Sequence, residues 1–161
     1  MGIRNVREMG DDILRKVSKP VKEMTPRLQG IIGDMLDTMY QQNGVGLAAP
    51  QVGILKRVVV IDVEDEHGAI VMINPEILET SGSQTGSEGC LSVPGKHGTV
   101  TRPNYVRARA QDINMETYEI EGEGLLARCI LHECDHLDGI LYVDKVEGPL
   151  KNNDDPDEEE E

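Results

Sequence analysis

One stretch of the chain decides how the rest must fold: Ala127-Arg128-Cys129-Ile130-Leu131-His132-Glu133-Cys134-Asp135-His136-Leu137. The stretch is typical of a helix, on which residues four positions apart lie one turn above each other on the same face. His132 and His136 are therefore placed to bind one metal ion together. We expect the other elements to fold around this helix.

Two carboxylates flank the histidine pair, at Glu133 and Asp135. Both lie about 80° round the helix from the midpoint of the pair, so angle alone does not choose between them. The longer side chain of Glu133 and the mechanics of the His-Glu-x-x-His motif favour Glu133 as a general base. The alternative interpretation is a core or surface helix that carries two histidines by chance.

A third metal ligand has to come from another segment, because a catalytic site of this kind usually has three protein ligands and one open position. Cys134 falls about 180° away on the helix, and Cys129 lies roughly 7 to 8 Å along the axis from the midpoint of the histidines. The best candidate is Cys90, which otherwise reads as a small buried residue, and His97 is its rival.

Length and composition limit the class of protein. A chain of 161 residues suggests one catalytic domain, which we place at residues 1–149. Its core must be aliphatic, because the chain has no Trp or Phe and only four Tyr. The net charge of −14 argues against general binding to nucleic acids or anionic membranes, although half of it lies in residues 154–161. No signal-peptide pattern or apolar stretch of about 18 residues occurs, so we expect a cytoplasmic protein.

The order of the predicted elements indicates an α+β fold. An amphipathic helix near the N-terminus is predicted to begin at Pro26, with Thr25 as its N-cap. Strands are predicted at residues 57–61, 69–73, 106–110 and 116–120, and a loop at 80–89. Strands and helices do not alternate, so we predict antiparallel strands packed around a central metal-binding His-Glu-x-x-His helix. Residues 150–161 are polar and acidic and are predicted to form a disordered tail.

Three segments, taken together and in order, resemble the bacterial peptide deformylases. That family is marked by a GxGLAAxQ segment, an EGCLS segment and a helical HExDH segment. In this chain they stand as Gly44-Val45-Gly46-Leu47-Ala48-Ala49-Pro50-Gln51, Glu88-Gly89-Cys90-Leu91-Ser92 and His132-Glu133-Cys134-Asp135-His136. The intervening sequence is also similar, from about residue 3 to residue 145.

The resemblance implies a metal-dependent hydrolase that removes the N-formyl group from the N-terminal methionine of new polypeptides. By position, it implies Cys90, His132 and His136 as metal ligands and Glu133 as the general base. It implies that the Gln51 amide and the Leu91 backbone N–H hold the charge that develops on the formyl oxygen. The substrate-binding residues that we expect are Val45, Gly46, Gly89, Leu125, Arg128 and Cys129. The cofactor would be one divalent metal ion, usually Fe²⁺ in the family, although Zn²⁺, Ni²⁺ or Co²⁺ can occupy such a site.

The chain departs from the family pattern at Leu131, where Gln is common, at Cys134, and at Arg128, where an apolar residue is common. We expect Arg128 to extend to the rim of the cleft and to attract a carboxylate on the residue that follows methionine. Many relatives dock on the ribosome through a longer, basic C-terminal helix, and the acidic C-terminus argues against that route. The expected partners are N-formyl-methionyl peptides, and neither a nucleic acid nor a membrane.

Two other functions fit parts of the same pattern. A metallopeptidase would use the helix to cut internal peptide bonds, in a cleft open at both ends. A non-enzymatic module would hold a structural metal with four protein ligands, the fourth being His97 or another group.

Overall fold

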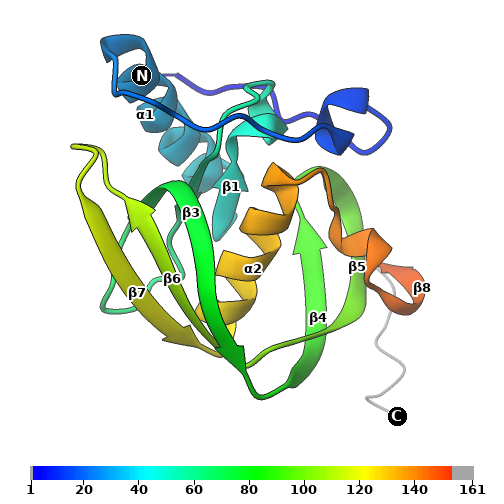
Figure 1. Ribbon diagram of the computed structural model, residues 1–161. Helices are drawn as coiled ribbons and strands as arrows, with labels where there is room; N and C mark the ends of the chain where they lie inside the picture. Colours follow the sequence, from blue (N-terminus) through cyan, green and yellow to red (C-terminus); the bar gives the residue numbers. More distant parts are fainter. Residues whose placement is uncertain (1, 154–161) are drawn as a thin grey trace.

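The computed structural model describes residues 2–153 and has the predicted α+β architecture (Figure 1). Its two α-helices are α1 (Pro26–Gln41) and α2 (Leu125–Leu137), and short 3-10 helices span Asp12–Arg15, Ala49–Val52 and Tyr142–Asp144. The strands are β1 (Gly46–Ala48), β2 (Val58–Ile61), β3 (Ile70–Ser81), β4 (Gln84–Cys90), β5 (Val93–Arg102), β6 (Tyr105–Gln111), β7 (Thr117–Glu123) and β8 (Glu147–Asn152).

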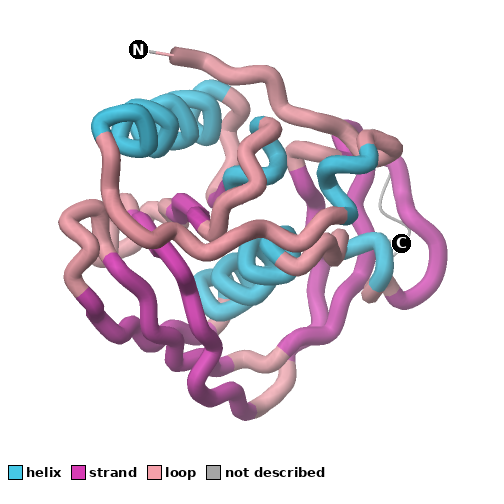
Figure 2. The backbone as a smooth tube through the Cα atoms, turned by 45° about the horizontal axis from the view of Figure 1, so that its top comes forward, coloured by secondary structure: helices cyan, strands magenta, loops and turns pink. Residues whose placement is uncertain are grey.

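The strands form two antiparallel sheets. One sheet has five strands in the order β1-β2-β3-β6-β7, and the other has three in the order β4-β5-β8. Figure 1 shows α2 in the centre, with β3, β6 and β7 on one side and β4 and β5 on the other. The same enclosure of α2 between two groups of strands is visible in Figure 2. The predicted arrangement of antiparallel strands around the His-Glu-x-x-His helix is therefore confirmed.

The two α-helices cover opposite faces of the five-stranded sheet, and β2 lies between them. Val59 packs in one apolar cluster with Ile130 of α2, whereas Val58 packs in another with Met35 of α1. Successive side chains of a strand point to opposite faces. A strand covered on both faces must be apolar throughout, which explains why all four residues of β2 are buried.

Helix α1 begins where its sequence predicts. The Thr25 hydroxyl accepts a hydrogen bond from the backbone N–H of Leu28 at 3.1 Å, and Pro26 occupies the first helical position. The residues that α1 buries recur at helical spacing: Leu28, Ile31, Ile32, Met35, Thr38 and Met39. This stripe fixes α1 on the sheet by burying apolar surface.

The prediction of a loop at residues 80–89 is wrong. β3 continues to Ser81 and β4 begins at Gln84, so only two residues connect the strands. β4 pairs with β5 along most of its length, from Gln84 opposite Arg102 to Glu88 opposite Gly98. The polar, glycine-rich composition suggested a loop, but the one charged residue of this strand, Glu88, finds partners on α2 and β5, as the site shows.

The boundary predicted for the acidic tail also needs correction. Residues 150–152 belong to β8, in which Lys151 pairs with His97 and Asn152 pairs with Lys96 of β5. The half-buried side chain of Leu150 packs on the apolar cluster of the three-stranded sheet. The rest of the predicted tail, residues 154–161, lies outside the described residues.

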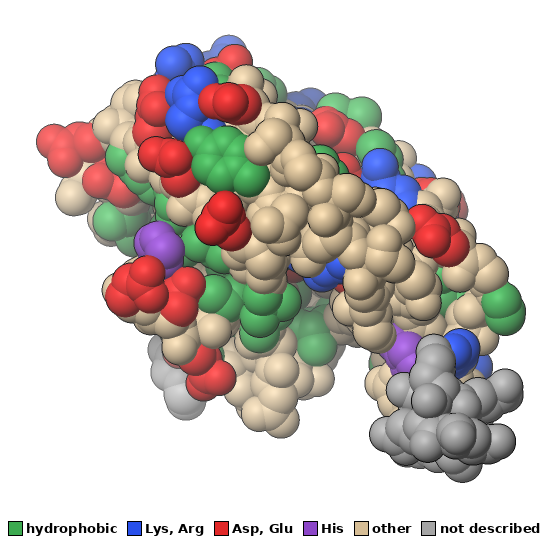
Figure 3. Space-filling view, turned by 90° about the horizontal axis from the view of Figure 1, so that it is seen from below, with side chains coloured by type: hydrophobic (Ala, Val, Ile, Leu, Met, Phe, Trp, Pro, Cys, Tyr) green, Lys and Arg blue, Asp and Glu red, His purple; other side chains and the backbone are tan. Residues whose placement is uncertain are grey.

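The surface carries the excess of negative charge that the composition requires. Figure 3 shows acidic side chains spread over the face seen from below, with a histidine beside one group of them. Within residues 2–153, neither α-helix has the length and apolar character needed to cross a lipid bilayer.

Candidate active site

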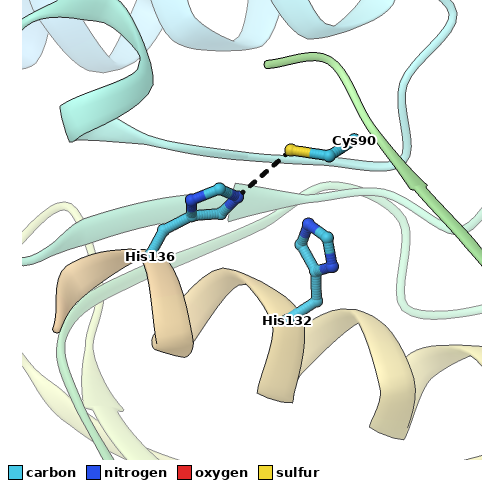
Figure 4. A group of neighbouring side chains, drawn as sticks. All are labelled: Cys90, His132 and His136. Carbon is cyan, nitrogen blue, oxygen red and sulfur yellow. Dashed lines mark hydrogen bonds between the residues drawn. The ribbon is translucent and has the colours of Figure 1, made fainter. Parts of the chain in front are cut away.

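Helix α2 places His132 and His136 one turn apart, as its spacing predicts. The two imidazole rings have centroids 5.0 Å apart, and both side chains are buried. Figure 4 shows both rings on the same side of the helix, facing Cys90. The helix starts after Gly124, whose φ of 60° is a conformation that glycine adopts without strain.

Cys90, at the end of β4, is the third member of this group. Its Sγ lies 3.4 Å from His136 Nε2, and one ligand atom from each of the three residues lies within 4.8 Å of the others. A thiolate binds a divalent metal at about 2.3 Å and an imidazole at about 2.0–2.1 Å. The observed separation therefore suits two atoms that share one ion in a nearly tetrahedral arrangement.

The rival ligands lie elsewhere. His97 Nδ1 is 2.7 Å from Asn153 Oδ1, beside the pairing of β5 with β8. Cys129 is buried with its thiol 3.5 Å from the carbonyl oxygen of Val45, and Cys134 packs on the core between α2 and the sheet. Within the described chain, the group that can hold one ion at this site is thus the one predicted from the sequence, a thiolate with two imidazoles. This donor set suits a divalent transition metal.

Glu88 fixes the orientation of His132. The Nδ1 atom of His132 donates a hydrogen bond to Glu88 Oε1 at 2.8 Å, which leaves Nε2 for a metal ion. The Glu88 carboxylate also accepts hydrogen bonds from Arg102 at 2.9 Å and from Arg128 at 2.6 Å. Burial alone would raise the pKa of Glu88, but the hydrogen bonds from His132 and Arg102 lower it to about 2. Glu88 is therefore a permanent anion among three cationic or polar donors.

The two carboxylates that flank the histidines have different surroundings. Glu133 is buried beside the cavity, and burial raises its pKa to about 7. Its Oε1 has no hydrogen-bond partner among the described residues. Asp135 instead accepts a hydrogen bond from Arg102 Nη1 at 3.1 Å. The angle around the helix did not distinguish Glu133 from Asp135, but their tertiary contacts do. These contacts favour Glu133 as the general base.

Gly46 on β1 makes room for Glu133. A Cβ atom at Gly46 would lie 2.5 Å from Glu133 Oε2 and 2.8 Å from Cys129 Sγ. Both distances are shorter than a Cβ atom makes to atoms that are not bonded to it. Any other residue would therefore displace the carboxylate. The glycine-rich segment, which could have been only a connector, allows the backbone of β1 to approach the helix closely.

Gln51 is held beside Cys90 by hydrogen bonds at both ends of its amide. Its Oε1 accepts from the Ala48 backbone N–H at 2.9 Å, and its Nε2 donates to Ser92 Oγ at 3.0 Å. The same Nε2 lies 3.5 Å from Cys90 Sγ. The amide group is therefore buried next to the metal-binding group in a fixed orientation.

These groups open onto a cavity of about 450 Å³ between α2, β4 and the segment before β1. The predicted site residues that line it are Val45, Gly46, Gln51, Gly89, Cys90, Leu91, Leu125, Arg128, Cys129, His132 and Glu133. Val45 and Leu125 are exposed at the cavity, whereas Cys129 is buried. Apart from His136, which is not among the lining residues, the residues predicted for the site therefore lie around one cavity.

The expectation that Arg128 reaches the rim of the cleft is wrong. Its side chain is only 7% exposed, and its guanidinium forms a buried ion pair with Glu88. An arginine extends to solvent when no acid is within reach. Here the anionic Glu88 keeps the guanidinium inside the protein.

Three polar residues of the site were missed from the sequence: Glu88, Ser92 and Arg102. Glu88 and Cys90 are two residues apart and would share a face of a strand. This spacing did not point to Glu88 because residues 80–89 were predicted to form a loop. Nothing local to Arg102 or Ser92 indicates their partners.

A second group of possible metal ligands, Asp65, Glu66 and His67, lies in an exposed turn. His67 Nδ1 is 3.1 Å from Asp65 Oδ1. Exposed acidic clusters of this kind are common on protein surfaces, and none of these three residues is buried.

The family model described as polypeptide deformylase matches residues 3–152. A peptide deformylase of Agathobacter rectalis is 67% identical over 150 residues, which cover 93% of this chain and 94% of that protein. A peptide deformylase of Lachnoclostridium phytofermentans is 62% identical over 162 residues, covering 100% of this chain and 99% of that protein. The crystal structure of peptide deformylase from Thermotoga maritima superposes with a TM-score of 0.88 and 41% identity, covering 92% of this chain and 100% of that one.

Proposed function

The chain belongs to the polypeptide deformylase family, and from this membership we propose how its residues carry out the reaction. The chain is a metal-dependent hydrolase that removes the N-formyl group from nascent polypeptides. This activity decides against the two alternatives, a peptidase for internal peptide bonds and a module with a structural metal. The observation that carries the proposal is the convergence of Cys90, His132 and His136 beside the buried Glu133 carboxylate, whose Oε1 has no hydrogen-bond partner among the described residues.

Cys90, His132 and His136 would hold the divalent metal ion. When bound, the ion would supply Lewis-acid chemistry by lowering the pKa of a water molecule and polarising the formyl oxygen. The soft thiolate ligand suits Fe²⁺ as well as Zn²⁺, Ni²⁺ or Co²⁺. Of these metals we propose Fe²⁺, as the resemblance to the family implies.

Glu133 moves the proton. A carboxyl group whose pKa is about 7 can accept a proton from the attacking water and later donate it to the departing amine. The bond between the formyl carbon and the nitrogen breaks, a bond from that carbon to the water oxygen forms, and formate leaves.

Gln51 and the backbone N–H of Leu91 hold the charge that develops on the formyl oxygen. The Gln51 amide is suited to this role because Ala48 and Ser92 fix it in place before the substrate binds. Preorganised donors of this kind are commonly worth about 3 kcal/mol each in the transition state. The cavity lined by Val45, Leu125 and Cys129 then holds the methionine side chain.

We further propose that residues 2–153 act as a single catalytic domain and that the enzyme works in the cytoplasm, where new polypeptides are made. Its partners are then N-formyl-methionyl peptides.

The proposal is tested with the chain purified without oxygen and loaded separately with Fe²⁺, Zn²⁺, Ni²⁺ or Co²⁺. Formate release is measured from formyl-Met-Ala-Ser, with acetyl-Met-Ala-Ser and an unformylated longer peptide as controls. We expect rapid release from the formylated peptide alone, and fastest release with Fe²⁺. Cleavage of the internal peptide bonds, or equal turnover of the acetylated peptide, would contradict the proposal.

A further inference from the structure

The buried guanidinium of Arg128 has one group that nothing in the described protein satisfies. Nη1 donates to Glu88 Oε2 at 2.6 Å, and Nε lies 3.4 Å from Gln84 Oε1. Nη2 is buried and has no acceptor among the described residues. A guanidinium is always charged and cannot lose its proton to escape this position.

An unmade hydrogen bond from a buried charged group is costly, so such a donor is expected to find an acceptor in water or in a ligand. Arg128 lines the same cavity as Glu133 and His132, one helical turn before His132. The side chain that carries the unpaired donor therefore borders the space that a ligand in this cavity would occupy.

Gly86 leaves space beside this donor. A Cβ atom at Gly86 would lie 3.4 Å from Arg128 Nη2 and 3.9 Å from its Cζ, with no other neighbouring atom within 4 Å. Gly86 and Glu88 share the face of β4 that points at α2 because they are two residues apart. A larger residue at position 86 would therefore contact Nη2.

The cavity is also lined by apolar side chains, among them Val45, Leu91, Leu125 and Cys129. They suit the unbranched side chain of methionine. A thioether sulfur is only a weak acceptor, however, and matches a charged donor poorly. Oxidation of methionine to its sulfoxide keeps nearly the same shape and adds a polar oxygen.

We propose that Arg128 Nη2 donates a hydrogen bond to the sulfoxide oxygen of an oxidised N-terminal methionine, so that the enzyme also deformylates N-formyl-methionine sulfoxide peptides. The inference rests on the proposed function and names a further substrate class for the same site. The chemistry is the same hydrolysis: one water is consumed, the formyl carbon–nitrogen bond breaks, and formate and the free amine are released. The sulfoxide itself is unchanged.

The test compares three tripeptides that differ only in their first side chain: formyl-methionine, formyl-methionine sulfoxide and formyl-norleucine, each followed by Ala-Ser. The readout is the ratio of kcat/KM for the sulfoxide to kcat/KM for norleucine, an apolar chain of similar length. Arg128→Met removes the donor and keeps an unbranched side chain of comparable length. We expect this ratio to fall at least about tenfold, the scale of a hydrogen bond to a charged group.

A second variant keeps the arginine. Gly86→Val leaves the ion pair between Arg128 and Glu88 and fills only the space beside Nη2, in a strand where valine is well tolerated. We expect the same ratio to fall, which decides the question even if Arg128→Met fails to fold. The matched control is Arg109→Met, which removes an arginine on β6 whose partners are Glu76 and Glu119. Its ratio should equal that of the wild type.

The outcomes separate the inference from the function on which it rests. Equal ratios in the wild type, Arg128→Met and Gly86→Val would overturn the inference. So would a wild type that hydrolyses the formyl-methionine peptide and leaves the sulfoxide untouched. A wild type that releases no formate from formyl-methionine with any of the four metals would instead overturn the proposed function, and the inference with it.

Discussion

Helices α1 and α2 pack on opposite faces of one sheet but bury very different side chains. Apart from Thr38, the residues that α1 buries are apolar, and they join a cluster that includes Met35, Leu47 and Val58. α2 also buries apolar residues against the sheet, but its other side buries Arg128, His132, Glu133 and His136. One helix is therefore stabilised by burying apolar surface, and the other also carries charges into the interior.

This difference between the two helices indicates that α2 carries the active site. A buried charge is costly unless it is paired, so charges persist in the interior mainly where they have partners or a role. On α2, Arg128 and His132 share Glu88, whereas Glu133 is left with an unpaired oxygen beside the cavity. Substitutions in α2 should therefore affect catalysis first, and those in α1 should affect stability first.

The largest effect is expected at Cys90. Cys90→Ala removes the thiolate ligand, so the purified protein should lose most of its bound metal and nearly all its activity. Metal content is measured by elemental analysis and activity by formate release. Cys134→Ala is the matched control, since that thiol packs in the core outside the metal-binding group, and it should keep its metal. Stoichiometric metal in Cys90→Ala would remove Cys90 from the ligand set.

Glu133→Gln should keep its metal but lose activity by at least about 100-fold, because it removes the general base and preserves shape. Kinetics on formyl-Met-Ala-Ser and metal analysis of the same sample test this. Asp135→Asn, which alters the other flanking carboxylate, should lose far less. Full turnover by the metal-loaded Glu133→Gln protein would contradict the mechanism.

Met35→Ala tests the other helix. It leaves a cavity beneath α1 at a fully buried position, and should lower the free energy of unfolding by about 2–5 kcal/mol. Denaturant unfolding measures the loss, and kcat of the folded protein should be unchanged. Leu36→Ala, at a half-buried position of the same helix, should cost less. A drop in kcat without a drop in stability would erase the contrast between the helices.

Thr25→Ala should lower the free energy of unfolding by about 0.5–2 kcal/mol, because it removes the side-chain acceptor at the start of α1. Thermal or denaturant unfolding reports the change. Thr25→Ser keeps the hydroxyl and should restore most of the stability. If serine and alanine proved equivalent, the cap would contribute nothing to α1.

The smallest effect is expected from removing residues 154–161, which should leave kcat/KM on short peptides within about twofold, because the residues proposed for metal binding and catalysis all precede them in the chain. A longer truncation, from residue 147 onward, also deletes β8 and the packing of Leu150. The longer truncation should lower the unfolding midpoint. A large kinetic loss on removing residues 154–161 alone would show that these residues take part in catalysis.

Much of the site could be predicted because its geometry is local. His132, Glu133 and His136 lie within five residues of one helix, and helical spacing alone puts the two imidazoles on one face. The N-cap at Thr25 was equally local and was predicted correctly, as were strands at residues 106–110 and 116–120, which pair as β6 and β7. Cys90 lies outside this helix. It was grouped with His132 and His136 because two histidines alone leave a catalytic metal site one protein ligand short.

The sequence by itself determined the metal-binding face of α2, the apolar stripe of α1 and the family. Only the tertiary structure decided that residues 84–90 form a strand, that Arg128 stays inside, and that Glu133 and Asp135 differ. The physical reason is that Glu88 finds Arg102 14 residues away and Arg128 40 residues away. Ion pairs between distant segments follow no local periodicity. They hold a polar stretch, which reads as a loop, in a strand whose Glu88 side chain is buried.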